Sequence, residues 1–240
     1  MDMMVRLAMS GAKNTMLAQA VNVNNLANAS TPGFRGDLLK FATEQNTDGH
    51  ESVPINSTDF RSGELQATGR SMDVAIDGEG WMVAQAPDGG EVYTRRGDLS
   101  INGQGQLTNG AGLPIMGNGG PIALPPSAQV EIGGDGTISV VPIGQGPNAL
   151  AIVDRIALVE LDENSLAKGE DGLLRLTNGA EAIPNAEIEL ISGTLESSNV
   201  NPIEALVKMI DLAREFETQV KMMDTAERND QSLATILRIK

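Results

Sequence analysis

Apolar residues recur at alternating spacings of three and four over the last forty residues of the chain. They occupy Leu206, Met209, Ala213, Phe216, Val220 and Met223. This spacing predicts one apolar stripe along an α-helix. Asn201 suits the N-cap, Pro202 the first helical position and Glu204 a capping box, and no Gly or Pro follows. We therefore predict a single helix from Asn201 to about Leu237, roughly 50 Å long at about 1.5 Å per residue.

Residues 1–28 predict a second amphipathic helix. A heptad-like seam of small or flexible residues runs through Val5, Met9, Ala12, Met16, Gln19, Val23 and Leu26. Two alternatives follow from the spacing: the helix packs on its own domain, or it has a coiled-coil partner. Because the C-terminal helix must also bury its stripe, it is the first candidate for that partner.

An Asn-rich segment ends the first helix. It reads Asn24-Asn25-Leu26-Ala27-Asn28-Ala29-Ser30-Thr31-Pro32-Gly33-Phe34-Arg35. Asn disfavours a helix interior, and Thr-Pro-Gly is typical of a turn. Three Asn in five positions exceed what ending a helix requires. Their side-chain amides can satisfy backbone groups at the helix end or on a neighbouring chain.

Residues 36–72 show no sustained periodicity and are predicted to form an extended connector. The sequence Asp48-Gly49-His50-Glu51 is typical of a loop tip. His50 is the single histidine of the chain. Catalytic and metal sites need partners at set spacings, and none are present, so we interpret His50 as a solvated loop residue.

Residues 73–198 predict an all-β domain, because short alternating runs are separated by Gly, Asn and Asp. The clearest unit is a hairpin over 130–140 that turns at Gly133-Gly134-Asp135-Gly136. Further strands are expected at 73–77, 81–84, 91–95, 99–101, 114–116, 155–161 and 187–190. Trp81 and Tyr93 fall within alternating runs and are expected in the core.

The predicted fold class is therefore mixed. Long N- and C-terminal α-helices, coiled-coil-like in pattern, flank a central all-β domain of the sandwich or barrel type. The predicted segments are 1–35 for the N-terminal helix and its motif, 36–72 for the connector, 73–198 for the β domain and 199–240 for the C-terminal helix, which packs with the N-terminal one.

The net charge of -15 is concentrated in the centre of the chain. Residues 41–198 carry -16, whereas 1–40 carry +2 and 199–240 carry -1. An acidic centre repels nucleic acid and anionic lipid, so neither is an expected partner. No segment has the roughly 20 apolar residues of a membrane span, and the N-terminus lacks the pattern of a cleavable secretory signal. The chain has no Cys, which excludes disulfides and thiolate metal sites.

No motif indicates catalysis, a metal or a cofactor. Gly78-Glu79-Gly80 and Gly103-Gln104-Gly105 are not followed by a predicted helix and are interpreted as turns. Asp135-Gly136 lacks the spaced acidic ligands of a calcium loop. A secreted β-rich enzyme or carbohydrate-binding protein remains an alternative, and it would need acidic pairs or exposed aromatic residues in the β domain.

Motifs at both ends resemble those of the bacterial flagellar axial proteins, the rod and hook family. The Asn-rich segment is similar to that family's Asn-Asn-Leu-Ala-Asn-x-x-Thr-x-Gly-Phe signature, and 195–201 to its Ser-Asn-Val-Asn motif. Residues 69–83 and 93–99 also resemble central segments of the family, with Met72, Met82 and Leu99 in place of the usual Leu, Phe and Phe. The resemblance covers nearly the whole chain and is weakest over 40–65 and 142–185.

The resemblance implies a structural subunit of the basal-body rod, a torque-transmitting shaft across the periplasm. Implied partners are proximal and distal rod subunits, copies of the chain itself and the flagellar type III export apparatus, with no cofactor. Residues 29–35, 201–207 and 226–232 are more similar to the proximal-rod branch than to the distal rod or hook, which remain alternatives.

We expect the assembly contacts to come from the two terminal segments. The N-terminal candidates are Val5, Met9, Ala12, Met16, Val23, Asn24, Asn25, Leu26, Asn28, Thr31, Gly33 and Phe34. The C-terminal candidates are Ser198, Asn199, Val200, Asn201, Leu206, Met209, Ala213, Phe216, Val220 and Met223. We expect both ends to be poorly ordered or swapped in an isolated subunit and to order on assembly.

Overall fold

The chain divides into a helical unit and a β unit. The computed structural model describes residues 2–46, 49–144, 149–169, 171–177, 179 and 182–238. The helical unit comprises Met1–Ala29, Asp37–Ser57 and Val200–Lys240, and the β unit comprises Ser30–Gly36 and Thr58–Asn199. The predicted order of an N-terminal helix, a mostly β centre and a C-terminal helix is confirmed. Neither helix is apolar over a length that would cross a membrane, within the residues described.

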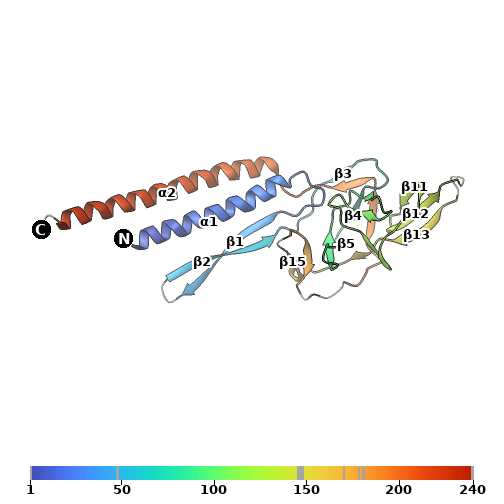
Figure 1. Cartoon of the computed structure of the whole chain (residues 1–240), viewed down its shortest axis with the longest axis horizontal. Coiled ribbons are helices and arrows are strands. Elements are labelled where there is room, and N and C mark those ends of the chain that lie inside the picture. Colours follow the sequence, from blue (N-terminus) through green and yellow to red (C-terminus); the bar gives the residue numbers. More distant parts are fainter. Residues whose placement is uncertain are drawn as a thin grey trace. The chain divides into compact units, whose positions relative to one another are not determined.

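Two antiparallel helices, α1 (Asp2–Ala27) and α2 (Pro202–Arg238), make up most of the helical unit (Figure 1). Their antiparallel pairing is fixed at one end by the Asn22 side-chain amide, which donates to the Ala205 carbonyl at 2.8 Å. Because α2 has 37 residues and α1 has 26, α2 runs about 11 residues, roughly 16 Å, past the start of α1.

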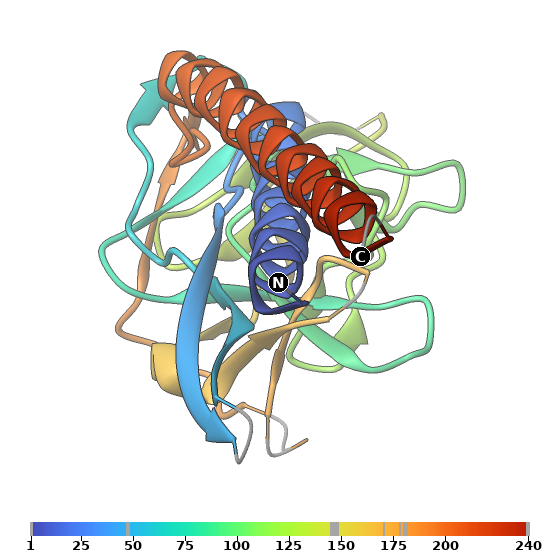
Figure 2. The ribbon, with the colours of Figure 1, turned by 90° about the vertical axis from the view of Figure 1, so that its left-hand side faces the viewer.

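A β-hairpin packs beside α1 (Figure 2). Its strands are β1 (Asp37–Asn46) and β2 (Gly49–Thr58). The sequence predicted only an extended connector here, so the pairing of these strands was missed. The predicted loop tip lies partly outside the described residues, and His50 lies in β2 and not in a loop.

The β unit contains many short strands. They are β3 (Leu65–Ala67), β4 (Val74–Asp77), β5 (Trp81–Gln85), β6 (Glu91–Thr94), β7 (Ser100–Ile101), β8 (Leu107–Thr108), β9 (Met116–Gly117), β10 (Gly120–Pro121), β11 (Ser127–Ile132), β12 (Thr137–Pro142), β13 (Ala151–Arg155), β14 (Leu158–Val159), β15 (Leu166–Lys168), β16 (Leu174–Leu176), β17 (Glu189–Ser192) and β18 (Thr194–Glu196). A 3-10 turn, Glu163–Ser165, precedes β15.

A five-stranded sheet in the order β14-β5-β6-β16-β15 and a three-stranded sheet in the order β11-β12-β13 are the largest in the described residues. The hairpin predicted at 130–140 is confirmed, with Ile132 opposite Ile138. The single strand predicted at 155–161 is wrong. The chain there divides between two sheets, because the Ile156 N–H donates to Gly136 and the Ala157 N–H to Met116.

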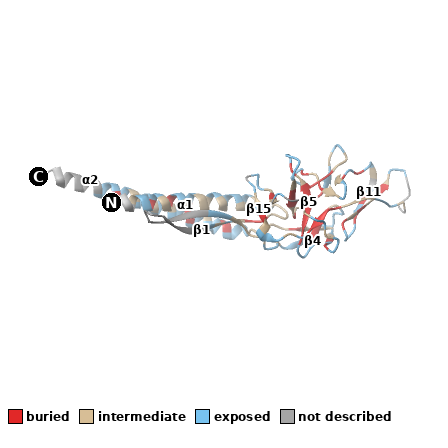
Figure 3. Ribbon diagram, turned by 90° about the horizontal axis from the view of Figure 1, so that it is seen from below, coloured by how far each residue is buried: buried red, intermediate tan, exposed pale blue. Residues whose placement is uncertain are grey.

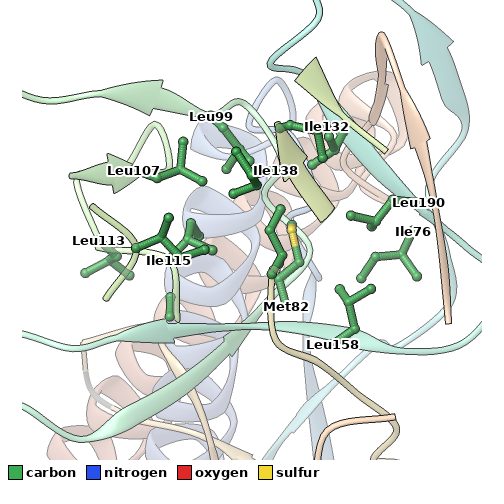
Figure 4. Close-up of a cluster of buried hydrophobic side chains, with 14 of the residues drawn as sticks. Ile76, Met82, Leu99, Leu107, Leu113, Ile115, Ile132, Ile138, Leu158 and Leu190 are labelled. Carbon is green, nitrogen blue, oxygen red and sulfur yellow. The ribbon is translucent and has the colours of Figure 1, made fainter. Parts of the chain in front are cut away.

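Strand β5 lies between two apolar clusters. Met82 and Ala84 point into the larger cluster, while Trp81 and Val83 point into the smaller one. This division follows from the period of two along a strand. Figure 4 shows Met82 among the side chains of the larger cluster, and Figure 3 shows the buried residues around β4 and β5. The expected core positions of Trp81 and Tyr93 are thereby confirmed.

Candidate assembly surfaces and terminal motifs

Residues on the paired faces of α1 and α2 recur three and four apart, and we call this set the inner seam. On α1 the buried or half-buried members are Val5, Ala8, Ala12, Thr15, Gln19, Asn22 and Leu26. On α2 they are Ala205, Met209, Leu212, Phe216, Gln219, Met223 and Ala226. Most members on α1 are small or polar, so the inner seam buries little apolar surface there.

Every second position of the predicted stripes lies outside the inner seam, so only half of each stripe faces the other helix. Met9 and Met16 are 58% and 57% exposed, and Leu206 is 50% exposed. The structure buries the neighbouring small or polar residues because the helices approach closely. A Cβ added at Gly11 would lie 2.8 Å from the Gln219 side chain.

The apolar residues left outside the inner seam form two outer stripes. On α1 the outer stripe is Met9, Met16 and Val23, each exposed and seven residues from the next. On α2 it is Ile203, Leu206, Val207, Ile210, Ala213 and Val220. Large aliphatic and thioether side chains therefore face solvent along both helices.

A cavity of about 340 Å³ lies between α1 and the β1–β2 hairpin. Its lining consists of Leu17, Ala20, Val21, Asn24, Asp37, Leu39 and Asn56. Asn24 is exposed and belongs to this lining. Among the described residues, it is the one Asn of the predicted trio whose side-chain amide does not donate to the backbone.

The other two Asn of the trio satisfy backbone groups within the chain, which is one of the two predicted roles. The Asn25 amide donates to the Asp37 carbonyl, and the Asp37 N–H donates to the Asn25 side-chain oxygen, both at 2.8 Å. The Asn28 amide donates to the Asn24 carbonyl at 3.0 Å. The two bonds between Asn25 and Asp37 hold the start of β1 to the end of α1.

Asn201 caps α2 as predicted. Its side-chain oxygen accepts from the N–H groups of Ile203 at 2.9 Å and Glu204 at 3.4 Å. No bond from the Asn201 N–H to the Glu204 carboxylate is present in the described part of the chain, so only half of the predicted capping box forms.

Replacing Asn201 with alanine is expected to destabilise the helical unit by about 1 kcal/mol, because two N–H groups lose their acceptor. Denaturant unfolding followed by circular dichroism measures the loss. Asn229→Ala, at an exposed position of the same helix away from its N-terminus, is the matched control and should not lower stability. An equal loss in both variants would contradict the capping role.

Both terminal motifs contribute to the β unit, where 33–36 and 196–199 lie side by side. The Gly33 N–H donates to the Glu196 carbonyl at 2.8 Å, and the Asn199 N–H donates to the Phe34 carbonyl at 3.3 Å. The Gly36 N–H donates to the Asn199 side-chain oxygen at 2.8 Å. Thr31, Ser198 and Val200 flank this contact and are half-buried.

A buried ion cluster links the same two segments. Glu196 is 1% exposed, and its carboxylate oxygens lie 2.7 Å from Arg35 Nη2 and 3.1 Å from Arg95 Nη1. Arg95 also donates to the carbonyls of Gly78 and Gly80. Burial lowers the pKa of the Arg35 guanidinium below its ordinary value, and the Glu196 carboxylate opposes that shift.

Both guanidiniums of the ion cluster lie close to an aromatic ring. The guanidinium carbons of Arg35 and Arg95 lie 5.8 Å and 5.4 Å from the centre of the Trp81 ring. Phe60 meets Trp81 edge-on, with ring centres 5.9 Å apart. Lys168 Nζ lies 4.4 Å above the Phe34 ring. Cation–π contacts of this kind add to the ion pairs.

Gly33 fits only as glycine at this place. Its φ is +66°, and an added Cβ would clash with the backbone carbonyl group of Arg95. Sequence reasoning placed Gly33 and Phe34 among the assembly residues and assigned no role to Arg35, Arg95 or Glu196. The sequence singles out these three residues only in that each lies within a segment that resembles the family: 24–35, 93–99 and 195–201.

Three family models match the chain. Residues 6–35 match "Flagella basal body rod protein", 75–140 match "Flagellar hook protein FlgE/F/G D1 domain", and 191–236 match "Flagellar basal body rod FlgEFG protein C-terminal". The flagellar basal-body rod protein FlgF of Salmonella typhimurium is 42% identical over 96% of this chain and 96% of its own length. The chain belongs to the FlgF-type flagellar basal-body rod proteins.

Further relatives agree with this family. FlgF of Escherichia coli is 38% identical over 95% of this chain and 96% of its own length. FlgG of Buchnera aphidicola subsp. Schizaphis graminum is 32% identical over 94% of this chain and 97% of its own. In this FlgF-type chain the terminal models cover most of α1 and α2 and, apart from Gly36, both halves of the contact between the motifs.

Proposed function

We propose that this rod protein is a structural subunit of the proximal rod, that it is not an enzyme, and that it self-assembles through the outer stripes of α1 and α2. The observation that supports this most directly is the exposure of large apolar side chains while the inner seam on α1 is small and polar. Fully burying one Leu, Ile or Met contributes about 1.5–3 kcal/mol. Neighbouring subunits are the natural source of that burial.

The proposed assembly is a coiled-coil-like packing of terminal helices. Met9, Met16 and Val23 repeat every seven residues on α1, as do Leu206, Ala213 and Val220 on α2. A seven-residue apolar repeat suits packing against another helix. The part of α2 that extends past α1 offers further helix to a neighbour. Contacts between unlike surfaces of successive subunits generate an open helical assembly.

The remaining segments take complementary roles in this proposal. The helices α1 and α2 build the shaft, and the β unit keeps its acidic surface in water. The partners are copies of the chain, the proximal and distal rod proteins, and the flagellar type III export apparatus. The assembled shaft crosses the periplasm within the basal body and transmits torque.

The test is a charge placed in each outer stripe. Met16→Glu and Leu206→Glu are expected to abolish motility and to leave the subunit absent from purified basal bodies, because a buried unpaired carboxylate opposes packing. The free subunit should unfold within about 0.5 kcal/mol of the parent, as for most surface changes.

Thr218→Glu adds the same charge to an exposed position of α2 outside the outer stripe and should assemble normally. Normal motility and incorporation of both outer-stripe variants would overturn the proposed assembly surface. A distal position of the labelled subunit in basal bodies viewed by electron microscopy would instead favour a distal-rod subunit.

A further inference from the structure

We infer that Arg35, Arg95, Glu196 and Asn199 form a clasp, which holds the chain that leaves α1 and the chain that leads into α2 at a fixed separation. The clasp lies wholly within the β unit, so it acts before and independently of assembly. In this inference Gly33, Phe34 and Asn199 serve the subunit's own geometry instead of contacts between subunits.

Three passages of the chain meet at the clasp. The first contributes 33–36, the second 59–63 and the third 196–199. Asn199 bonds two of them at once, because its amide donates to the carbonyls of Asp59 at 2.8 Å and Arg61 at 2.9 Å while its oxygen accepts from Gly36. The Gly63 N–H donates to Glu196 at 2.8 Å. Each passage is therefore bonded to at least one other by a buried or half-buried side chain.

The buried ion cluster is not explained by a gain in stability. We explain it by the position in which it fixes the chain. Arg35 and Glu196 side chains are 2% and 1% exposed, and burying paired charges is often no more favourable than apolar packing. The Nε and Nη1 atoms of Arg35 have no hydrogen-bond partner among the described residues. What Arg35 supplies is a long planar group, fixed between Glu196 and the Trp81 face, on the segment that follows α1.

The consequence rests on the proposed function. The chain passes between the two units at four places, and the two that continue directly from α1 and into α2 are at residues 30 and 199. In a shaft under torque, force on either helix enters the β unit at these two places. Because the clasp bonds residues 33–36 to residues 196–199, the chain segments at residues 30 and 199 are tied together and share that force. Arg35 and Asn199 are accordingly positioning residues.

The chain has no Cys, so a thiol-reactive spin label modifies only the cysteines that are introduced. It has one Trp, so tryptophan fluorescence reports on Trp81 alone. Spin labels on Ser30→Cys and Ser198→Cys in the full-length, monomeric chain report the separation of the two crossings by electron paramagnetic resonance. We expect a narrow distance distribution in the labelled parent. Arg35→Met and, separately, Asn199→Ala should broaden it at least twofold and shift Trp81 emission.

The melting midpoint of the Arg35→Met β unit is expected to stay at or above that of the parent, because Arg95 still neutralises Glu196. Arg35→Lys should restore much of the narrow distribution. Arg96→Met is the matched control, since it removes the ion pair with Asp98 in the same unit but outside the clasp, and it should leave the distribution narrow.

A distribution that stays narrow in both Arg35→Met and Asn199→Ala would overturn the clasp. Equal broadening in the Arg96→Met control would do the same. These measurements use the monomer, so they test the clasp independently of assembly. Outer-stripe variants that contradict the assembly proposal would leave the clasp standing. A clasp that is overturned would likewise leave the assembly proposal standing.

Discussion

Replacing Glu196 with glutamine is expected to lower the free energy of unfolding of the β unit by about 3–5 kcal/mol, because it leaves buried charge without its counter-ion. Arg35 and Arg95 both face this one carboxylate. Its removal therefore leaves two buried guanidiniums with no anion in contact. Denaturant unfolding followed by Trp81 fluorescence measures the change directly, since the guanidinium carbons of Arg35 and Arg95 lie 5.8 Å and 5.4 Å from the centre of the Trp81 ring.

Glu189→Gln provides the control for this prediction. Glu189 is an exposed residue of β17 in the same unit, and its replacement should change the free energy of unfolding by less than about 0.5 kcal/mol. If Glu196→Gln were as mild as Glu189→Gln, the ion cluster would not depend on the carboxylate. The contrast with Arg35→Met is equally informative, because that variant leaves a one-to-one pair.

The helices follow from local sequence, but the register of their contact does not. An alternation of three and four that includes Met9 also fits Ala8, one residue away, and the same applies to Leu206 and Ala205. Hydrophobicity favours the larger residue of each pair. The close approach at Gly11 and Gln219 favours the smaller one. The distance between two helices is a tertiary quantity, so the spacing of apolar residues alone could not choose.

Sequence reasoning identified the β hairpin at 130–140 because its alternation and glycine turn are local. It missed the β1–β2 hairpin, whose strands lack sustained alternation. It also missed the clasp, where Arg35 and Glu196 are 161 residues apart in the chain. A buried ion pair of such separation leaves no periodic pattern, and only the tertiary structure brings its members together.

Phe216→Asp is expected to separate α1 from α2 and to block incorporation into the rod. Phe216 is the largest side chain of the inner seam, and placing a carboxylate there should cost the helical pair about 2 kcal/mol or more. That cost corresponds to amide exchange about 30-fold faster throughout both helices, at about 1.4 kcal/mol per tenfold. Hydrogen exchange measured by mass spectrometry on the dilute chain follows α1, α2, β4 and β5 in one experiment.

Amides of β4 and β5 should keep their protection in this variant, since their core lies within the β unit. Thr218→Asp, which adds a carboxylate on the exposed face of α2, should leave both units unchanged.

The parent chain tests the expectation that the ends order on assembly: α1 and α2 should exchange faster than β4 and β5 in the monomer, and slow down in assembled rods. Protection of the monomer's helices equal to that of β4 and β5 would contradict that expectation. Loss of the β unit's cooperative melting in Phe216→Asp would contradict the separate roles of the two units.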